Sequence, residues 1–146
     1  MDKNNPIIRL VNKGTELEKE KRVDDAQKLF VQAWNEATND WEKCIAAHFV
    51  ARHQTSPEES LKWNMESLTQ ANNVHEPIIR GYYPSLYLAV GTSYEKIGNV
   101  IEAKRYYQLA FERISDLPTD PENEHYSKGV RETILERKTA LDQKMS

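Results

Sequence analysis

The chain has 146 residues, of which 20 are basic and 23 acidic, so its formal net charge at pH 7 is −3. This length predicts one domain with an ordinary core, and the mild acidity argues against a general DNA or membrane-surface binder, which needs a basic face. A single cysteine excludes an internal disulfide and favours a reducing, cytoplasmic compartment. Since no apolar run resembles a bilayer span or a signal peptide, we expect neither membrane insertion nor secretion.

Apolar residues recur at steps of three and four along almost the whole chain, and no stretch alternates with period two, which predicts an all-α fold. The breaks are legible. Ser56 to Glu59 reads as a capped helix start with proline at the first helical position, and Gly98-Asn99 ends one helix and opens another. Residues 122–144 read as a last helix with a thin apolar seam of Val130, Ile134 and Leu141.

An internal repeat organises these helices. Ala26 and Ser60, small residues in the middle of second helices, lie 34 positions apart. The same offset relates Gly14 to His48, Leu17 to Ala51, and Ala33 to Ser67. From Ser60 the next step is 43, so an insertion of nine residues, 75–83, separates the second repeat from the third. The repeats are then residues 7–40, 41–74 and 84–117 of a single domain, 1–146.

The third repeat resembles the tetratricopeptide repeat (TPR) family most closely. The matching positions are Tyr87, Val90-Gly91, Tyr94, Ala103, Tyr107 and Ala110. The first repeat matches at Gly14, Leu17, Ala26, Phe30 and Ala33, whereas the second departs from the family because His48 replaces the glycine and Asn64 the large aromatic. The resemblance implies an α-solenoid of three antiparallel helix pairs closed by a capping helix, 122–144. The segments 47–54 and 83–87 also resemble small stand-alone bacterial TPR proteins.

In TPR proteins the first helix of each pair lines a concave groove, so the resemblance implies a protein- or peptide-binding module. The residues expected at the groove are Ile45, Phe49, Arg52 and His53 in the second repeat, Leu88, Thr92, Glu95 and Lys96 in the third, and Val11, Thr15, Glu18 and Lys19 in the first. Arg52 can hold a carboxylate through two parallel hydrogen bonds, with His53 as a titratable cation beside it and Phe49 as apolar contact. In the alternative interpretation, Arg52 and His53 decorate a solvated helix end.

The insertion is a second candidate site. Arg80, Tyr82 and Tyr83 would lie at the groove rim and close over a ligand as a lid, which would suit small-ligand sensing. The alternative is an ordinary connection whose Ile78, Ile79 and one tyrosine pack onto the helices.

Signatures of an enzyme, a cofactor or a metal centre are missing. The sequence has no glycine-rich phosphate loop and no Gly-x-Ser-x-Gly elbow, and Cys44 on an apolar stripe reads as structural. Cys44 and His48 share a helix face but lack further ligands for zinc. His48 itself reads as a packed, hydrogen-bonded core histidine rather than as a polar group of the groove.

We therefore expect a cytoplasmic binding protein whose partner is another protein or a peptide, with no cofactor, no nucleic acid and no membrane. The alternative is a self-assembling scaffold, a homo-oligomer formed through uncapped helix faces. Exposed Ile7, Ile8 and Leu10 on the first helix would favour that alternative.

Overall fold

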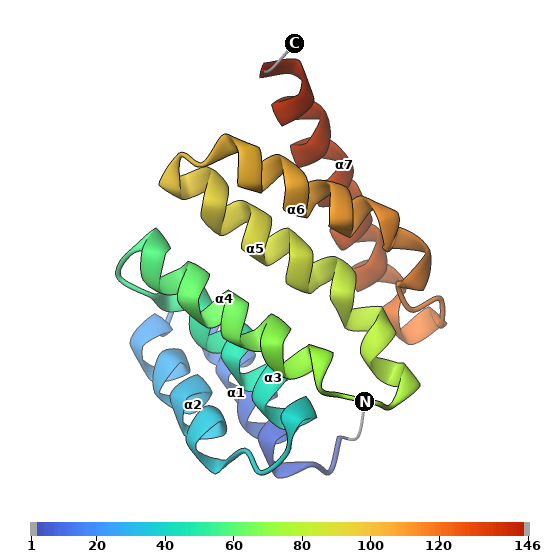
Figure 1. The fold of residues 1–146 in the computed structure, drawn as a ribbon. Coiled ribbons are helices and arrows are strands. Elements are labelled where there is room, and N and C mark those ends of the chain that lie inside the picture. The colour runs from blue at the N-terminus through green and yellow to red at the C-terminus, as the bar shows by residue number, and fades with distance from the viewer. Residues whose placement is uncertain (1–2, 145–146) are drawn as a thin grey trace. The chain divides into compact units, whose positions relative to one another are not determined.

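A computed structural model describes residues 3–144, with side chains as far as residue 143. Over this range the chain is helical and contains no strand, which confirms the expected all-α class (Figure 1). The α-helices are α1 (Pro6–Lys19), α2 (Val23–Glu36), α3 (Asp40–Val50), α4 (Pro57–Asn72), α5 (Tyr83–Ile97), α6 (Val100–Glu112) and α7 (Glu124–Lys144). Short 3-10 turns are η1 (Ala51–His53), η2 (Pro77–Tyr82), η3 (Ile114–Asp116) and η4 (Pro121–Asn123).

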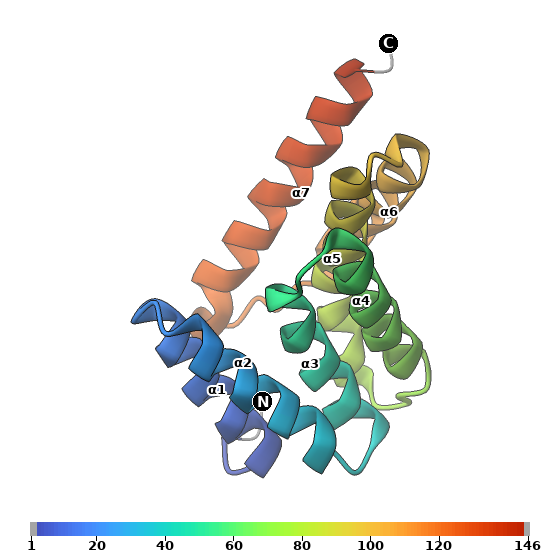
Figure 2. The ribbon, with the colours of Figure 1, turned by 90° about the vertical axis from the view of Figure 1, so that its left-hand side faces the viewer.

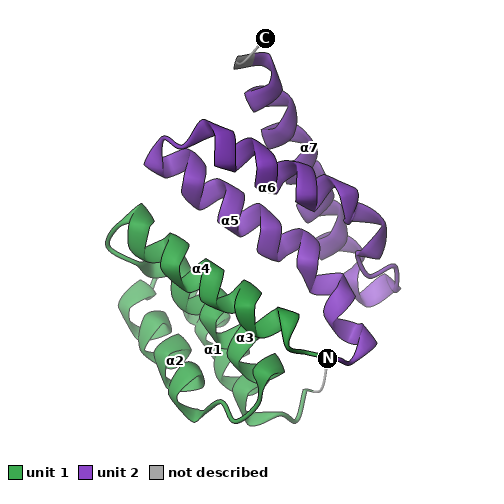
Figure 3. Ribbon diagram, in the orientation of Figure 1, with its two compact units in different colours: residues 1–74 green, residues 75–146 purple. Residues whose placement is uncertain are grey.

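The chain divides into two compact units, Met1–Val74 and His75–Ser146, at the start of the predicted insertion (Figure 3). In the first unit α1 pairs with α2 and α3 with α4, while α3 lies mainly on α2 and makes a smaller contact with α1. Figure 2 shows α1 and α2 side by side. In the second unit α5 pairs with α6, while α7 lies mainly on α6 and makes a smaller contact with α5. The third helix of each unit therefore packs on the preceding pair in the same manner.

Side-chain caps begin several helices at the expected places. The Ser56 hydroxyl accepts a hydrogen bond from the Glu59 backbone N–H at 3.1 Å, as the sequence predicts. The Asn5 side chain, which the sequence pattern did not single out, accepts one from the Ile7 N–H at 2.8 Å. Helix α7 begins at Glu124 rather than at residue 122, because Pro121–Asn123 forms a 3-10 turn before it.

The same chain reversal ends α1 and α5. Lys21 and Gly98, which the repeat places in register, both adopt left-handed backbone with φ of 63° and 95°. In each case the next residue's N–H reaches back over the last helical turn, from Arg22 to the Leu17 carbonyl at 2.9 Å and from Asn99 to the Tyr94 carbonyl at 3.0 Å. The internal repeat is therefore present in the backbone as well as in the sequence.

Two glycines mark the closest approach within the helix pairs. Gly14 on α1 lies against the Phe30 ring of α2, and Gly91 on α5 lies against the Tyr107 ring of α6, with both rings fully buried. A Cβ on Gly91 would stand 2.6 Å from Tyr107 Cε1, and one on Gly14 would overlap Phe30 Cε1. Close packing of helix on ring thus requires glycine at both positions.

In the pair α3/α4 the large residue lies on the first helix and the smaller one on the second, the reverse of the other two pairs. His48 stands on α3 at the register of the glycines, and buried Asn64 stands on α4 at the register of the rings. A larger residue on the first helix thus accompanies a smaller one on the second, which conserves the volume between the helices.

The apolar seam of α7 is the predicted one, since Ile134 and Leu141 are buried and Val130 is half-buried. The expectation for the first helix is wrong, because Ile7 and Ile8 are only 3% and 1% exposed. Asn5 starts the helix in a register that turns both isoleucines inward, and Leu10 is half-buried. Ile7 and Ile8 therefore offer almost no apolar surface for self-assembly.

We predict that Gly14→Ala and Gly91→Ala each lower the free energy of unfolding by about 1–3 kcal/mol, because the methyl group displaces a buried ring. Gly129→Ala in α7 is the matched control, since a Cβ there meets no atom within 4 Å. It should raise the stability by up to about 1 kcal/mol through helix propensity. Urea unfolding of the three variants measures the difference, and equal effects at all three positions would contradict the close-approach argument.

Candidate functional site

Three of the predicted binding residues lie together in the first unit, around a carboxylate of α1. The Arg52 Nη2 lies 3.1 Å from Glu18 Oε1, and the His53 Nε2 is hydrogen-bonded to Glu18 Oε2. The Glu18 side chain is only 12% exposed, whereas the Arg52 side chain is 46% exposed. Arg52 is thus ion-paired and His53 hydrogen-bonded across to α1, rather than both being simply solvated after the end of α3. We call Glu18, Phe49, Arg52 and His53 the Arg52 cluster.

Aromatic rings pack against the Arg52 and His53 side chains of the cluster. The Arg52 guanidinium lies over the Phe49 ring, 5.2 Å from its centroid. The Phe49 ring packs on Phe30, with ring centroids 5.2 Å apart, and the His53 ring stacks on Phe30 at 6.2 Å and 7°. The buried Phe30 ring, which packs against Gly14, therefore supports the Phe49 and His53 rings of the cluster from beneath.

The ion pair of Arg52 leaves its hydrogen-bonding capacity unused. Although Arg52 Nη2 is 3.1 Å from the buried Glu18 Oε1, the pair is not aligned as a hydrogen bond, and Oε1 has no hydrogen-bond partner within residues 3–143. The guanidinium carries five N–H donors in a planar fork. It is thus positioned by charge and by stacking, with donors left for another acceptor.

The second unit contains an equivalent pair that is bonded differently. Arg52 lies 34 residues after Glu18 and Glu95 lies 43 residues after Arg52, the two offsets of the repeat. Arg137 of α7 hydrogen-bonds both Glu95 oxygens, with Nε 3.2 Å from Oε1 and Nη2 on Oε2. The Tyr107 hydroxyl donates to the same Oε1 at 2.7 Å. The hydrogen bonds to Glu95 raise the pKa of the Arg137 guanidinium above its ordinary value. Arg137 is thus a structural partner of the Glu95 carboxylate.

The predicted groove residues of α5 take part in the packing of the second unit. Leu88 is half-buried against a cluster of Ala103, Tyr107 and Leu141, the last of which belongs to α7. The Thr92 hydroxyl donates to the Leu88 carbonyl at 2.9 Å, whereas Lys96 is exposed. With Ser85 bonded to Tyr126 and Glu95 to Arg137, α7 lies against the stripe of α5 where an open groove was expected.

The insertion folds as part of the second unit. Ile79 of η2 is buried, and a Cβ on Gly81 would stand 3.4 Å from the Asp116 carbonyl oxygen, so η2 packs close to η3. Tyr82 and Tyr83 are half-buried, and Arg80 is exposed. Ile79 thus packs as the ordinary-connection interpretation expects, whereas Ile78 is 50% exposed.

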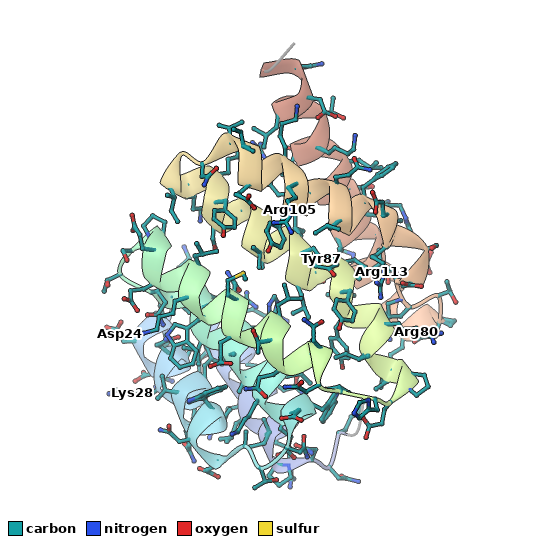
Figure 4. The ribbon with its side chains drawn as sticks, in the orientation of Figure 1. Asp24, Lys28, Arg80, Tyr87, Arg105 and Arg113 are labelled. Atoms are coloured by element: carbon teal, nitrogen blue, oxygen red, sulfur yellow. The ribbon has the colours of Figure 1, made fainter. Side chains whose placement is uncertain are left out.

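A row of aromatic rings that the sequence pattern did not predict runs along α5 and α6. Tyr83 and Tyr87 lie 5.6 Å apart, and Tyr87 and Tyr106 lie 6.2 Å apart. Arg113 covers the Tyr83 ring at 4.6 Å and Arg105 the Tyr106 ring at 5.2 Å (Figure 4). Each arginine is also paired to an acid on its own chain segment, Arg113 to Asp116 and Arg105 to Glu102. The spacing of four residues between Tyr83 and Tyr87 was the available signal.

Cys44 and His48 have no accessible reactive group. Burial raises the pKa of the Cys44 thiol to about 11, so the thiol stays protonated at neutral pH. Burial, with the nearby charge of Arg52, lowers the pKa of His48 to about 4. The expected hydrogen bond of a core histidine is not present at Nδ1, which is buried without a partner among the described residues.

Residues 3–143 contain no group of three or more His, Cys, Asp or Glu side chains placed to hold a metal ion. None of the helices in the described range combines the length and apolar character of a bilayer-spanning segment. No family model, curated protein or solved structure matches the chain. The functional argument therefore rests on the geometry of the Arg52 cluster.

We predict that stability decreases as the pH falls from 6.5 to 5. The pKa of His48 is about 4 in the folded chain and 6.5 in its ordinary environment, so over this window the unfolded state binds the extra proton. The loss should be on the order of 1–2 kcal/mol for this half-buried side chain. Urea unfolding at each pH should show a flatter profile for His48→Gln and the original slope for His125→Gln, which changes an exposed histidine. An unchanged slope in His48→Gln would contradict this assignment.

Proposed function

We propose that the protein is a TPR-type helical repeat protein that binds a peptide or protein partner through the Arg52 cluster, which anchors an acidic group. The repeat offsets, the glycine–ring contacts and the common turn at Lys21 and Gly98 support the repeat assignment. Glu18 and Phe49 lie on the first helices of their repeats, α1 and α3, where the resemblance expects a ligand, and Arg52 and His53 lie on η1, directly after α3.

The position of the Arg52 guanidinium carries the proposal. Stacking on Phe49 and the charge of Glu18 fix the side chain before any ligand arrives, so less conformational entropy is lost on binding. Its N–H fork is not consumed by Glu18, and it remains about half exposed. A preorganised guanidinium with unused donors is a good receptor for a carboxylate, because charge-assisted hydrogen bonds are about twice as strong as neutral ones.

The contrast with Arg137 separates this proposal from a purely structural ion pair. Where the chain uses the pair for structure, the arginine bonds both oxygens of Glu95 and a tyrosine hydroxyl adds a third bond. The Arg52–Glu18 pair in the first unit lacks such a pair of hydrogen bonds. We infer that the arginine of the first unit keeps N–H donors available for a ligand, whereas the arginine on α7 uses its donors on Glu95.

The partner that we propose is a protein or peptide in the cytoplasm. The net charge of −3 disfavours nucleic acid and anionic membranes, which are bound through broad basic surfaces. The only cysteine is a buried, protonated thiol, which is in keeping with a reducing compartment. The proposal involves no cofactor and no catalytic step.

We predict that Arg52→Ala weakens binding of acidic peptides by roughly 10- to 100-fold, the value of a charge-assisted hydrogen bond. A peptide array in which each acidic peptide is paired with its amide counterpart identifies binders of the wild-type chain, and fluorescence anisotropy then gives affinities. Arg52→Lys should lose a smaller factor, because it keeps the charge but not the planar fork.

Arg105→Ala is the matched control. Arg105 is also exposed, paired to an acid, Glu102, and stacked on a ring, that of Tyr106, but it belongs to α6 of the second unit. It should bind acidic peptides like the wild type. Equal binding by wild type and Arg52→Ala, with the helical circular dichroism of both intact, would overturn the anchor role.

A further inference from the structure

We propose that the second unit binds a basic amphipathic helix of a partner protein on α6 and α7, in the place that α4 takes in the first unit. The surface consists of Phe111, Gly129, Glu132, Leu135 and Glu136, which we call the α6/α7 face. Its residues all belong to the second unit, so the inference does not depend on the Arg52 cluster. It comes from equivalent residues of the two units, of which one set is covered by a helix and the other is exposed.

The two units can be aligned helix by helix. Equivalent residues of α1/α2 and α5/α6 lie 77 positions apart, as Gly14 and Gly91 do. For α3 and α7 the offset is 85, the separation of Arg52 and Arg137, which pair with equivalent carboxylates. The second offset also brings the starts of α3 and α7 to within one residue of each other. Within residues 3–144, only α4 has no equivalent in the other unit.

In the first unit, α4 covers one face of α3. The Ser67 hydroxyl donates to the Cys44 carbonyl at 2.7 Å, and the Ser60 hydroxyl donates to the Ala51 carbonyl at 2.8 Å. These two contacts fix α4 antiparallel to α3. Val50 of α3 is only 1% exposed in this packing.

The equivalent face of α7 is uncovered. Three buried residues of α3 have exposed equivalents on α7, namely Gly129 for Cys44, Glu132 for Ala47 and Glu136 for Ala51. Leu135, the equivalent of Val50, is 42% exposed. A Cβ on Gly129 would meet no atom within 4 Å. Glycine inside a helix costs stability, and here it leaves an open position at which another helix can approach closely.

The ring that α4 contacts on α2 also has an exposed equivalent. Trp63 of α4 packs edge-on against Trp34, with ring centroids 5.1 Å apart. Phe111 of α6 lies 77 residues after Trp34 and is 41% exposed. Lys43 lies over the Trp34 ring and Lys138 over the Phe111 ring. Because Trp34 accommodates both its lysine and Trp63, the lysine on Phe111 leaves room for a large apolar side chain.

Two carboxylates determine the charge of the occupant. Glu132 and Glu136 lie one turn apart on α7, and neither is ion-paired within residues 3–143. A helix that covers them has to supply cations, because carboxylates removed from water are costly without a charged partner. In the register of α4, Ser60 and Asn64 would stand over them, so α4 of a second copy leaves both unpaired. The helix that fits has a large apolar anchor and two lysine or arginine residues one turn apart.

The test uses a synthetic peptide built on α4, Pro57–Asn72, with Ser60→Lys and Asn64→Lys to place two cations over the carboxylates. A lactam bridge between Glu58 and Lys62, which are exposed on the opposite side of α4, keeps the peptide helical. Fluorescence anisotropy of the dye-labelled peptide measures its affinity for the full chain, and amide shifts of the ¹⁵N-labelled chain locate the site. We expect shifts on α6 and α7. A peptide with glutamate at the two positions should bind roughly tenfold or more weakly, because it meets like charges.

Variants of the full chain test the two features of the face separately. Gly129→Leu fills the open position, and it should weaken binding of the lysine peptide by roughly tenfold or more while the fold stays intact. Glu132→Lys combined with Glu136→Lys should reverse the preference, so that the glutamate peptide binds more tightly. Glu16→Lys combined with Glu20→Lys is the matched control, since these are exposed acids of the first unit that are also four residues apart. It should leave the preference unchanged.

The proposal is overturned if the lysine peptide does not bind, if it binds no better than the glutamate peptide, or if Gly129→Leu binds it fully. Shifts confined to α3 and its neighbours would also overturn it, because the peptide would then only replace α4 in the first unit. Sedimentation of the wild type alone should show no dimer that Gly129→Leu abolishes, since such a dimer would assign the face to a second copy. Arg52→Ala should bind the lysine peptide as the wild type does, so failure of the anchor role would leave this inference standing.

Discussion

The contact between a helix glycine and an aromatic ring is the constraint on which the rest of the structure depends. Gly14 admits the Phe30 ring and Gly91 admits the Tyr107 ring, at a distance that no Cβ would allow. Both rings are fully buried, and each fixes how deeply its helix pair closes. Because each ring stands next to a first-helix carboxylate, the packing also decides how that carboxylate is bonded.

One oxygen atom on the ring accounts for the difference between the two carboxylates. The Tyr107 hydroxyl donates one hydrogen bond to the Glu95 carboxylate, and Arg137 donates two more. The result is a structural network in which both carboxylate oxygens are hydrogen-bonded. Phe30 has no such oxygen, and His53 takes the donor role toward Glu18 by stacking on the Phe30 ring. Arg52 is then held by the charge of Glu18 and by stacking on Phe49, and its N–H donors make no hydrogen bond to Glu18.

The sequence predicted the parts of this account that follow from periodicity. The repeat offsets placed Gly14 and Gly91 in register, and the resemblance to TPR proteins implied the core position of Phe30 and a shared surface for Phe49, Arg52 and His53. Neither predicted that Glu18 pairs with that surface, although opposite charges one repeat apart on successive first helices were the available signal. The inward-facing register of Ile7 and Ile8 was not predicted, because it depends on the Asn5 cap. The packing of α7 against Leu88 was not predicted either, because this tertiary contact does not follow the sequence repeat.

Side-chain NMR of the arginines tests the central claim most directly, namely that Arg52 is positioned but not hydrogen-bonded while Arg137 is both. The account predicts slow hydrogen exchange and hindered rotation for the Arg137 guanidinium, because two bonds hold it to Glu95. For Arg52 it predicts fast exchange with water together with an upfield ring-current shift from Phe49. Protection of Arg52 equal to that of Arg137, or an Arg52 side chain without the ring-current shift, would contradict it.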